Sequence, residues 1–245
     1  MAASVRAGAA MLLLFCATTA TATLDLKRVH LVDSGPTNFL FRGNMPTNAT
    51  GFAYDQLIEY MQNRTQTEGK DNHTTLPANI RLMIISLNND FDGKDFKEER
   101  EFWADKAHSS LGNLTQWPIG VAGVLPPSAF PVADRAWMAN ESNPESVWSI
   151  DQVPERVRKI RAILTTPSDP PIAMFVHCSA GCDRTGEMIG AYIVEHLVQN
   201  VTVMYDQDTK ECGRSPDYFS TAVRRCVCVC AVSYTHLTLP TIYSV

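Results

Sequence analysis

Hydrophobic residues along the chain recur at two spacings, one typical of buried strands and the other of helices. Continuous apolar runs, IRLMIISL at 80–87 and PIAMFV at 171–176, predict strands that are buried on both faces. Two shorter runs, VHLVD at 29–33 and NFLFRG at 38–43, predict further strands. Because continuous apolar strands are typical of parallel sheets, the pattern favours such a sheet at the centre of the fold.

Helices are predicted where apolar residues recur every three or four positions. At 151–164 this spacing puts Val153, Val157, Ile160 and Leu164 on one side of a helix. The other predicted helices cover residues 52–62, 95–108 and 186–198. Strands and helices therefore alternate, which predicts an α/β fold of three layers, αβα, around a central, mostly parallel sheet.

The segment IAMFVHCSAGCDRTGEMIGAYIV at 172–194 interrupts this pattern with a compact polar turn. A strand that ends at His177 and a helix that starts near Thr185 place the turn at the carboxyl edge of the sheet, where ligands bind in such folds. Backbone N–H groups of residues 179–184 are then able to surround one anion, helped by the positive end of the helix dipole. The turn is therefore a candidate anion site.

Two side chains in this turn suit a phosphoryl group. Arg184 presents a planar guanidinium that holds two phosphate oxygens at once. The same positive field favours the thiolate form of Cys178, the first residue after His177. We therefore expect a phosphate-binding loop with a nucleophile at its floor. The alternatives are that Cys178 is a buried or disulfide-bonded structural cysteine and that His177 is a core histidine.

The motif HCSAGCDRTG at 177–186 resembles the Cys-x5-Arg signature of the protein tyrosine phosphatase superfamily, which includes dual-specificity and lipid-phosphate members. The resemblance implies the cysteine-based phosphatase fold, no metal or other cofactor, and catalysis through a phosphocysteine. The supporting pattern of strands and helices runs from Leu31 to about Phe219.

The resemblance also assigns roles to residues of the loop. Cys178 would attack phosphorus, Arg184 would bind the equatorial oxygens, Thr185 would hydrogen-bond the sulfur, and His177 would orient the loop. The residues expected to bind phosphate are Ser179, Ala180, Gly181, Cys182, Asp183, Arg184 and Thr185.

The general acid is less clearly marked. Asp183, just before the arginine, resembles the corresponding residue of myotubularin and Sac-type lipid phosphatases, and the resemblance to myotubularins implies that it donates the proton. No clear Trp-Pro-Asp loop is present, because WPIGV at 117–121 has Ile119 where the acid belongs. We expect Asp183 to be catalytic, and four further candidates stay open: Asp134, Glu141, Glu145 and Asp151.

The first residues predict export. Residues 1–22 combine one cation, an apolar core and a small-x-small site, which is typical of a secretory signal peptide. Six Asn-x-Ser/Thr sequons, at half of the twelve asparagines, predict a glycosylated protein that is secreted or lies in the lumen of the ER or another endomembrane compartment. They lie at Asn48, Asn63, Asn72, Asn113, Asn140 and Asn200.

Residues 226–245 change character abruptly and resemble translated adaptor sequence, so the phosphatase domain is predicted at 23–225. Without the cysteines of the signal and the tail, Cys178, Cys182 and Cys212 remain. In an oxidising compartment a Cys178–Cys182 disulfide would inactivate the enzyme reversibly. The alternative is that Cys182 only packs within the loop.

The net charge of the chain limits the classes of partner that we expect. The formal net charge of −5, with no basic block, argues against nucleic acid, and no stable membrane span is expected. NNDFDGKDFKEE at 88–99 has the spacing of a calcium-binding loop, but a strand pattern precedes it, so we interpret it as a strand-to-helix turn.

The substrate is predicted to be a phosphorylated protein, on phosphotyrosine or with dual specificity. The alternatives are a phosphoinositide phosphatase and a phosphate-binding pseudophosphatase.

Overall fold

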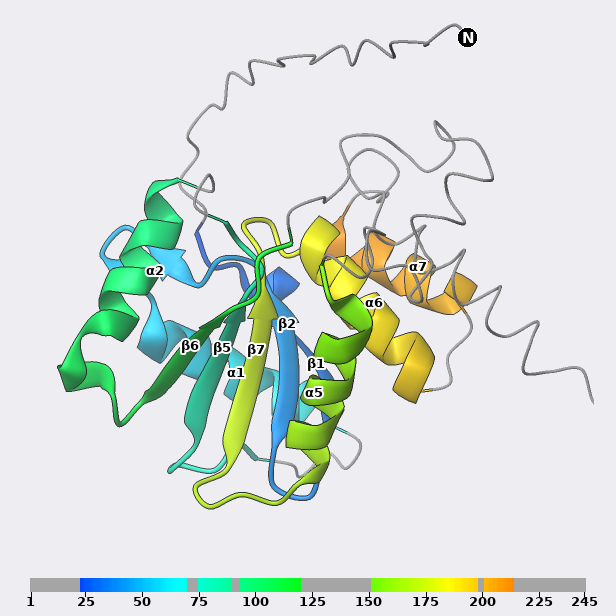
Figure 1. Cartoon of the computed structure of the whole chain (residues 1–245), viewed down its shortest axis with the longest axis horizontal. Coiled ribbons are helices and arrows are strands. Elements are labelled where there is room, and N and C mark those ends of the chain that lie inside the picture. The colour runs from blue at the N-terminus through cyan, green and yellow to red at the C-terminus, as the bar shows by residue number, and fades with distance from the viewer. Residues whose placement is uncertain (1–22, 70–74, 90–92, 120–150, 198–200, 214–245) are drawn as a thin grey trace, which may run out of the picture.

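The central sheet has five strands in the order β1-β2-β7-β5-β6 (Figure 1). The computed structural model describes residues 23–69, 75–89, 93–119, 151–197 and 201–213. The strands are β1 (His30–Ser34), β2 (Phe39–Gly43), β5 (Arg81–Ser86), β6 (Gly112–Gln116) and β7 (Ile172–His177). β2, β7, β5 and β6 run parallel, and β1 pairs antiparallel with β2 at one edge. The mostly parallel sheet is thus confirmed.

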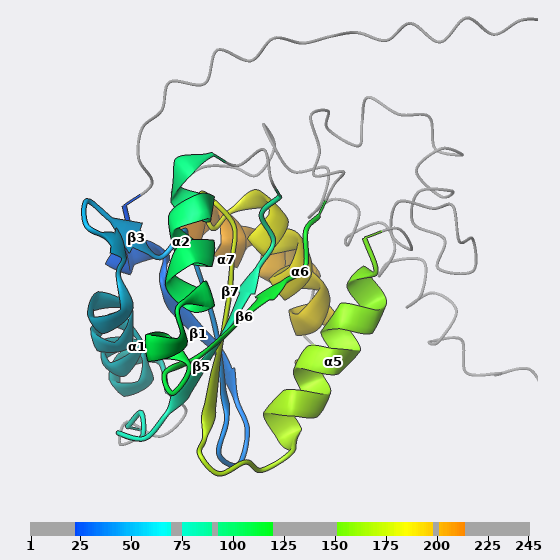
Figure 2. The ribbon, with the colours of Figure 1, turned by 60° about the vertical axis from the view of Figure 1, so that its left-hand side comes forward.

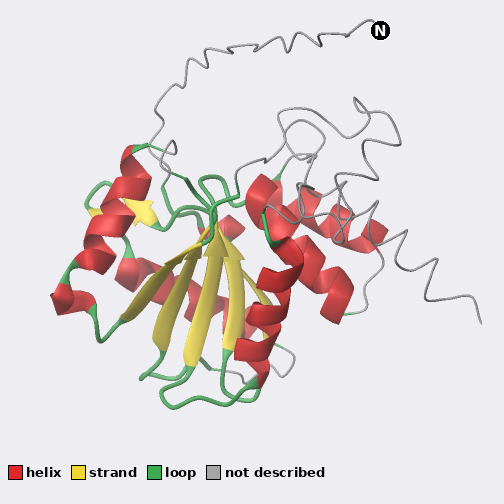
Figure 3. Cartoon of the chain, viewed as in Figure 1, coloured by secondary structure: helices red, strands yellow, loops and turns green. Residues whose placement is uncertain are grey.

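Helices cover both faces of the sheet, as Figures 2 and 3 show. One face carries α1 (Tyr54–Glu68) and α2 (Lys94–Ala104), and the other carries α5 (Val153–Thr165) and α6 (Asp183–His196). α7 (Val201–Cys212) packs against α6. Short elements complete the fold, namely η1 (Leu26–Arg28), η2 (Lys106–His108) and the pair β3 (Thr47–Asn48) and β4 (Gly51–Phe52). This is the predicted three-layer αβα architecture.

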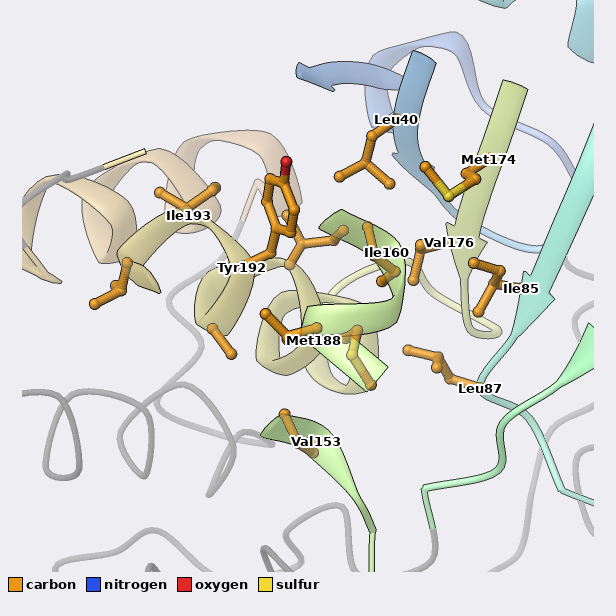
Figure 4. Close-up of a cluster of buried hydrophobic side chains, with 14 of the residues drawn as sticks. Leu40, Ile85, Leu87, Val153, Ile160, Met174, Val176, Met188, Tyr192 and Ile193 are labelled. Carbon is orange, nitrogen blue, oxygen red and sulfur yellow. The ribbon is translucent and has the colours of Figure 1, made fainter. Parts of the chain in front are cut away.

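Each face of the sheet has its own apolar cluster, because successive side chains of a strand point to opposite faces. From β7, Met174 and Val176 join the cluster under α5 and α6, while Ala173 and Phe175 join the cluster under α1. In the first cluster Tyr192 of α6 is fully buried among the side chains drawn in Figure 4. Burial on both faces explains why these strands appear in the sequence as continuous apolar runs.

The predicted helix at 151–164 corresponds to α5, and its four apolar positions are fully buried. Among the longer elements, β6 and α7 were not predicted. β6 is an edge strand of sequence GNLTQ, whose polar residues give no strand signal. α7 buries Met204, Asp208 and Cys212 along one side, a short stripe interrupted by a carboxylate, so it gives no clear helix signal.

The proposed signal peptide and the tail from residue 226 lie outside the described residues, so the domain boundaries stay predictions. Across the helices that the structure describes, none combines the length and apolar character that crossing a bilayer requires.

Candidate active site

The loop that carries the signature lies between β7 and α6, at the centre of the sheet's carboxyl edge. His177 ends β7 in register with Gly43 of β2 on one side and Ser86 of β5 on the other. Residues 178–182 form the loop, and α6 begins at Asp183. The amino end of α6 therefore points at the loop, where its dipole favours a bound anion.

Three consecutive carbonyl groups of the loop accept hydrogen bonds from outside it. The Met45 N–H donates to Ser179 O at 3.2 Å, Arg28 Nη1 to Ala180 O at 2.6 Å, and Arg42 Nη2 to Gly181 O at 2.9 Å. In a trans peptide the N–H points away from the carbonyl of the preceding residue. The N–H groups of residues 180–182 therefore face the opposite, concave side, where they suit the oxygens of an anion.

Gly181 allows the loop to lie this close to the end of β2. Its φ is +73°, a conformation that side chains rarely adopt. A Cβ built on it would lie 2.5 Å from Gly43 O and 2.6 Å from the Asn44 nitrogen. Only glycine fits at this position.

Cys178, the proposed nucleophile, is 2% exposed and belongs to the apolar cluster under α5 and α6. The next residue, Ser179, donates its hydroxyl to Asn88 Oδ1 at 3.2 Å. Asn88 follows β5, and Met45, which bonds to the Ser179 carbonyl, follows β2. The ends of the two strands beside β7 therefore hold the start of the loop.

His177 lies beneath the loop and pairs with a residue that the sequence did not reveal. Its Nε2 lies 2.9 Å from Oε1 of Glu99 on α2, and both side chains are fully buried. Glu99 ends the calcium-like motif, but here it belongs to α2, which starts at Lys94 shortly after β5. The interpretation of that motif as a strand-to-helix turn is thus confirmed at its described residues.

Arg184 extends along the carboxyl edge of the sheet. Its Nη1 donates to Leu87 O at 3.3 Å, and the same carbonyl accepts from the Ile119 N–H at 3.3 Å. The two carbonyl groups before Ile119, those of Trp117 and Pro118, accept hydrogen bonds from Arg156 of α5. The WPI segment therefore lies beside the arginine of the loop, although it carries no acid.

The acid candidates separate into two groups. Asp183 is the first residue of α6 and is partly exposed, while Asp151 is 3% exposed and lies close enough to Arg156 to act on its pKa. The other three, Asp134, Glu141 and Glu145, lie outside the described residues. The role of Asp183 stays a prediction, as does that of Thr185, whose fully buried hydroxyl has no hydrogen-bond partner among the described residues.

A buried ionic network braces the outer side of the loop. Besides its bond to Gly181, Arg42 lies 2.6 Å from Asp208 Oδ1 and 2.9 Å from Glu211 Oε2, both on α7. Burial raises the pKa of Asp208, and Glu211 and Asp183 add to the rise, while Arg42 opposes it. Sequence reasoning missed this network, because Arg42 lies more than 130 residues from its partners along the chain.

Among the residues that the structure describes, no group of three or more His, Cys, Asp or Glu side chains is arranged to hold a metal ion. The donors expected for an anion stay those that the sequence predicts, namely the backbone N–H groups of the loop and the Arg184 guanidinium.

Comparison with known proteins supports the resemblance. The family model described as protein-tyrosine phosphatase matches residues 134–214, which include the whole loop and α6. The resemblance to this cysteine-based phosphatase family is thereby confirmed. No curated protein matches the chain.

Several solved structures are similar in fold. Tk-PTP in its active form shares 11% identity over 86% of this chain and 98% of its own, with a TM-score of 0.41. TpbA of P. aeruginosa, solved in complex with pTyr, shares 14% over 87% and 91%, with a TM-score of 0.38. PTPMT1 shares 13% over 84% and 99%, with a TM-score of 0.40.

Proposed function

We propose that the protein is a cysteine-dependent phosphatase that hydrolyses phosphomonoesters of proteins through a phosphocysteine, in a secreted or luminal location. The observation that carries the proposal is the orientation of the loop. Its carbonyls are held outward by Met45, Arg28 and Arg42, so its N–H groups converge on the side where a phosphate would lie.

In the first step the thiolate of Cys178 attacks phosphorus in line with the leaving oxygen. A sulfur–phosphorus bond forms, the phosphorus–oxygen bond breaks, and the leaving oxygen takes a proton. The three equatorial oxygens carry the negative charge of the transition state, and the loop N–H groups with the Arg184 guanidinium stabilise it. Water then attacks phosphorus and gives a proton to the acid that was deprotonated in the first step. The sulfur–phosphorus bond breaks, inorganic phosphate leaves, and the thiolate is restored.

The proton comes from Asp183 in our proposal. A positioned carboxylic acid accelerates the loss of a poor leaving group by about 10²- to 10⁴-fold. Asp183→Asn should therefore slow alkyl phosphates far more than activated aryl phosphates. Asp151→Asn is the matched comparison, because Asp151 is the other candidate among the described residues. A leaving-group-dependent loss in Asp151→Asn, with equal losses for all substrates in Asp183→Asn, would assign the acid to Asp151.

The central experiment measures hydrolysis of para-nitrophenyl phosphate in the presence of EDTA. We expect turnover in the wild type and none in Cys178→Ser, because a serine hydroxyl in place of the thiolate is a poor nucleophile. A Tm of Cys178→Ser equal to that of the wild type is the control for folding. Binding of phosphate without turnover by the wild type would instead identify a pseudophosphatase.

The alternative substrate is a phosphoinositide, favoured by Asp183 immediately before the arginine. Phosphotyrosine, phosphoserine and phosphothreonine peptides and a set of phosphoinositides, compared by kcat/KM, distinguish the substrates. We expect the phosphopeptides to be preferred, because the loop at 178–184 carries no lysine and no second arginine to pair with further phosphate groups.

A further inference from the structure

Cys182 belongs to the loop, but its thiol faces the outer side. Its Sγ accepts a hydrogen bond from Arg28 Nη1 at 2.9 Å, and it lies 3.6 Å from Ala180 O. Arg28 also donates to that carbonyl, which is turned away from the concave side. Cys178, in contrast, packs in the apolar cluster under α5 and α6. The two thiols of the loop therefore lie in different surroundings.

The neighbour of Cys182 is Cys212, the last residue of α7. The two thiols are hydrogen-bonded to each other, and Cys212 Sγ lies 3.8 Å from Asp208 Oδ1. That hydrogen bond, then burial, then Asp208 raise the pKa of Cys212. The side chains are 2% and 6% exposed, so little water reaches the pair.

Tight packing fixes the position of Cys212. α7 approaches α6 at Gly186, where an added Cβ would lie 2.8 Å from Asp208 Oδ2, and at Gly190, where it would lie 2.9 Å from Met204 Sδ. Arg42 joins Asp208 to the Gly181 carbonyl, one residue before Cys182. Both cysteines are therefore held by the same buried contacts.

We infer that Cys182 and Cys212 form a disulfide bond that fastens the phosphate-binding loop to α7. This bond goes beyond the proposed function and does not depend on it. It also leaves Cys178 without Cys182 as a partner, so the nucleophile stays a thiol in an oxidising buffer. The pairing of Cys178 with Cys182 is the competing outcome.

The bond forms by thiol–disulfide exchange with a small disulfide such as oxidised glutathione, as α7 docks during folding. The Cys182 sulfur, beside the Arg28 cation, loses its proton and attacks one sulfur of the small disulfide, releasing one glutathione thiolate. Cys212 then loses its proton and attacks Cys182, which releases the second glutathione. The two protein thiols are oxidised by two electrons in total, and one glutathione disulfide is reduced to two thiols.

Peptide mapping tests the pairing directly. The full chain is refolded from urea in oxidised and reduced glutathione, alkylated and cut with trypsin. Cys178 and Cys182 fall together on peptide 162–184, Cys212 on peptide 211–214, and the tail cysteines on 226–245. We expect 162–184 joined to 211–214 in the wild type and in Cys178→Ser, and not joined in Cys182→Ser. An internal bond within 162–184, or alkylation of both thiols, would overturn the inference.

Thermal unfolding gives a second measurement. A disulfide that closes a loop of about 30 residues should raise the Tm by about 5 to 15 °C. Dithiothreitol should therefore lower the Tm of the refolded wild type by that amount and leave the Tm of Cys212→Ser unchanged. Cys212→Ser keeps the tail cysteines, so it controls for their reduction. Equal shifts in both proteins would show that the bond is elsewhere.

Discussion

At the residue scale, Gly181 sets the shape of the phosphate-binding loop. Alanine there would combine an unfavourable φ with a contact 2.5 Å from Gly43 O. Gly213 has nearly the same φ, +66°, but nothing within 4 Å of an added Cβ. Gly213→Ala should therefore cost about 1 kcal/mol in the free energy of unfolding. Gly181→Ala should cost several times more and lower kcat/KM, as urea denaturation and phosphatase assays can show. Equal costs would mean that the approach to β2 is unimportant.

The buried pair of His177 and Glu99 gives a second prediction. Glu99→Ala leaves His177 without this carboxylate at the base of the loop, and removing one partner of a buried pair costs about 3 to 5 kcal/mol. We expect a loss of that size in urea denaturation, together with a lower kcat. Glu98→Ala removes a partly exposed carboxylate that pairs with Lys94 one turn away, and it should cost far less, because exposed ion pairs contribute little. Similar losses in the two variants would contradict a supporting role for Glu99.

These residues also show which parts of the site can be predicted from the sequence. Cys178, Arg184 and the residues between them are contiguous, so one motif predicts their placement on one loop. Glu99, Arg42 and Asp208 support that loop from other elements, and only the packing of the sheet and helices brings them there. A lone charged residue in a sequence carries no signal that it is buried and paired.

At the scale of elements, Glu68 joins the end of α1 to β1. Its carboxylate accepts hydrogen bonds from the Leu31 N–H at 2.8 Å and Arg64 Nη1 at 3.1 Å, and it pairs with His30 Nδ1 at 3.0 Å. Burial alone would raise its pKa, but the contacts with His30, Leu31 and Arg64 lower it overall. The ionised form is therefore the one that stabilises the fold.

The pH dependence follows from that direction. A lowered pKa in the folded state gives stability that is present above the ordinary glutamate range and is lost as the pH falls through the folded value. Glu68→Gln should therefore destabilise the protein by about 1 to 3 kcal/mol at pH 7 and by progressively less below about pH 4.5. Urea denaturation at several pH values measures the difference. A difference that grows on acidification would contradict this assignment.

The elements that the sequence missed share a physical cause. β6 is paired on one side only and keeps polar residues, so periodicity does not reveal it. α7 buries Asp208 and Cys212, because Arg42 and Cys182 contact them from neighbouring elements. Hydrophobic patterns predict continuous apolar surfaces. β6 carries polar residues, and the buried side of α7 is interrupted by Asp208.

At the scale of the whole molecule, the order of the strands in the sheet explains why one short motif is enough to form the site. β7 lies in the middle, between β2 and β5, so its carboxyl end is surrounded by the ends of two parallel neighbours. Contacts from both reach the loop, through Met45 after β2 and Asn88 after β5. The alternation of strands and helices predicted the layers, whereas the order of strands came only from the structure.

The sequons bear on where the molecule works. Of the six, Asn63 on α1 and Asn113 on β6 are exposed, and Asn48 is half-buried; the other three lie outside the described residues. β6 forms an edge of the sheet, where unpaired backbone groups invite pairing with another chain. A glycan at Asn113 would cover that edge. We propose that the protein enters the ER and carries glycans at Asn63 and Asn113.

Expression of the full chain in a eukaryotic cell tests this proposal. The secreted or luminal product should move faster on a gel after endoglycosidase treatment. Asn63→Gln and Asn113→Gln should each remove one step of mobility before treatment, because each destroys one acceptor site. Asn79→Gln is the matched control, since Asn79 is exposed but has no Ser or Thr two positions later. A product that keeps its N-terminus and shows no shift with endoglycosidase would place the protein outside the secretory route, and the disulfide between Cys182 and Cys212 would then form only in an oxidising buffer.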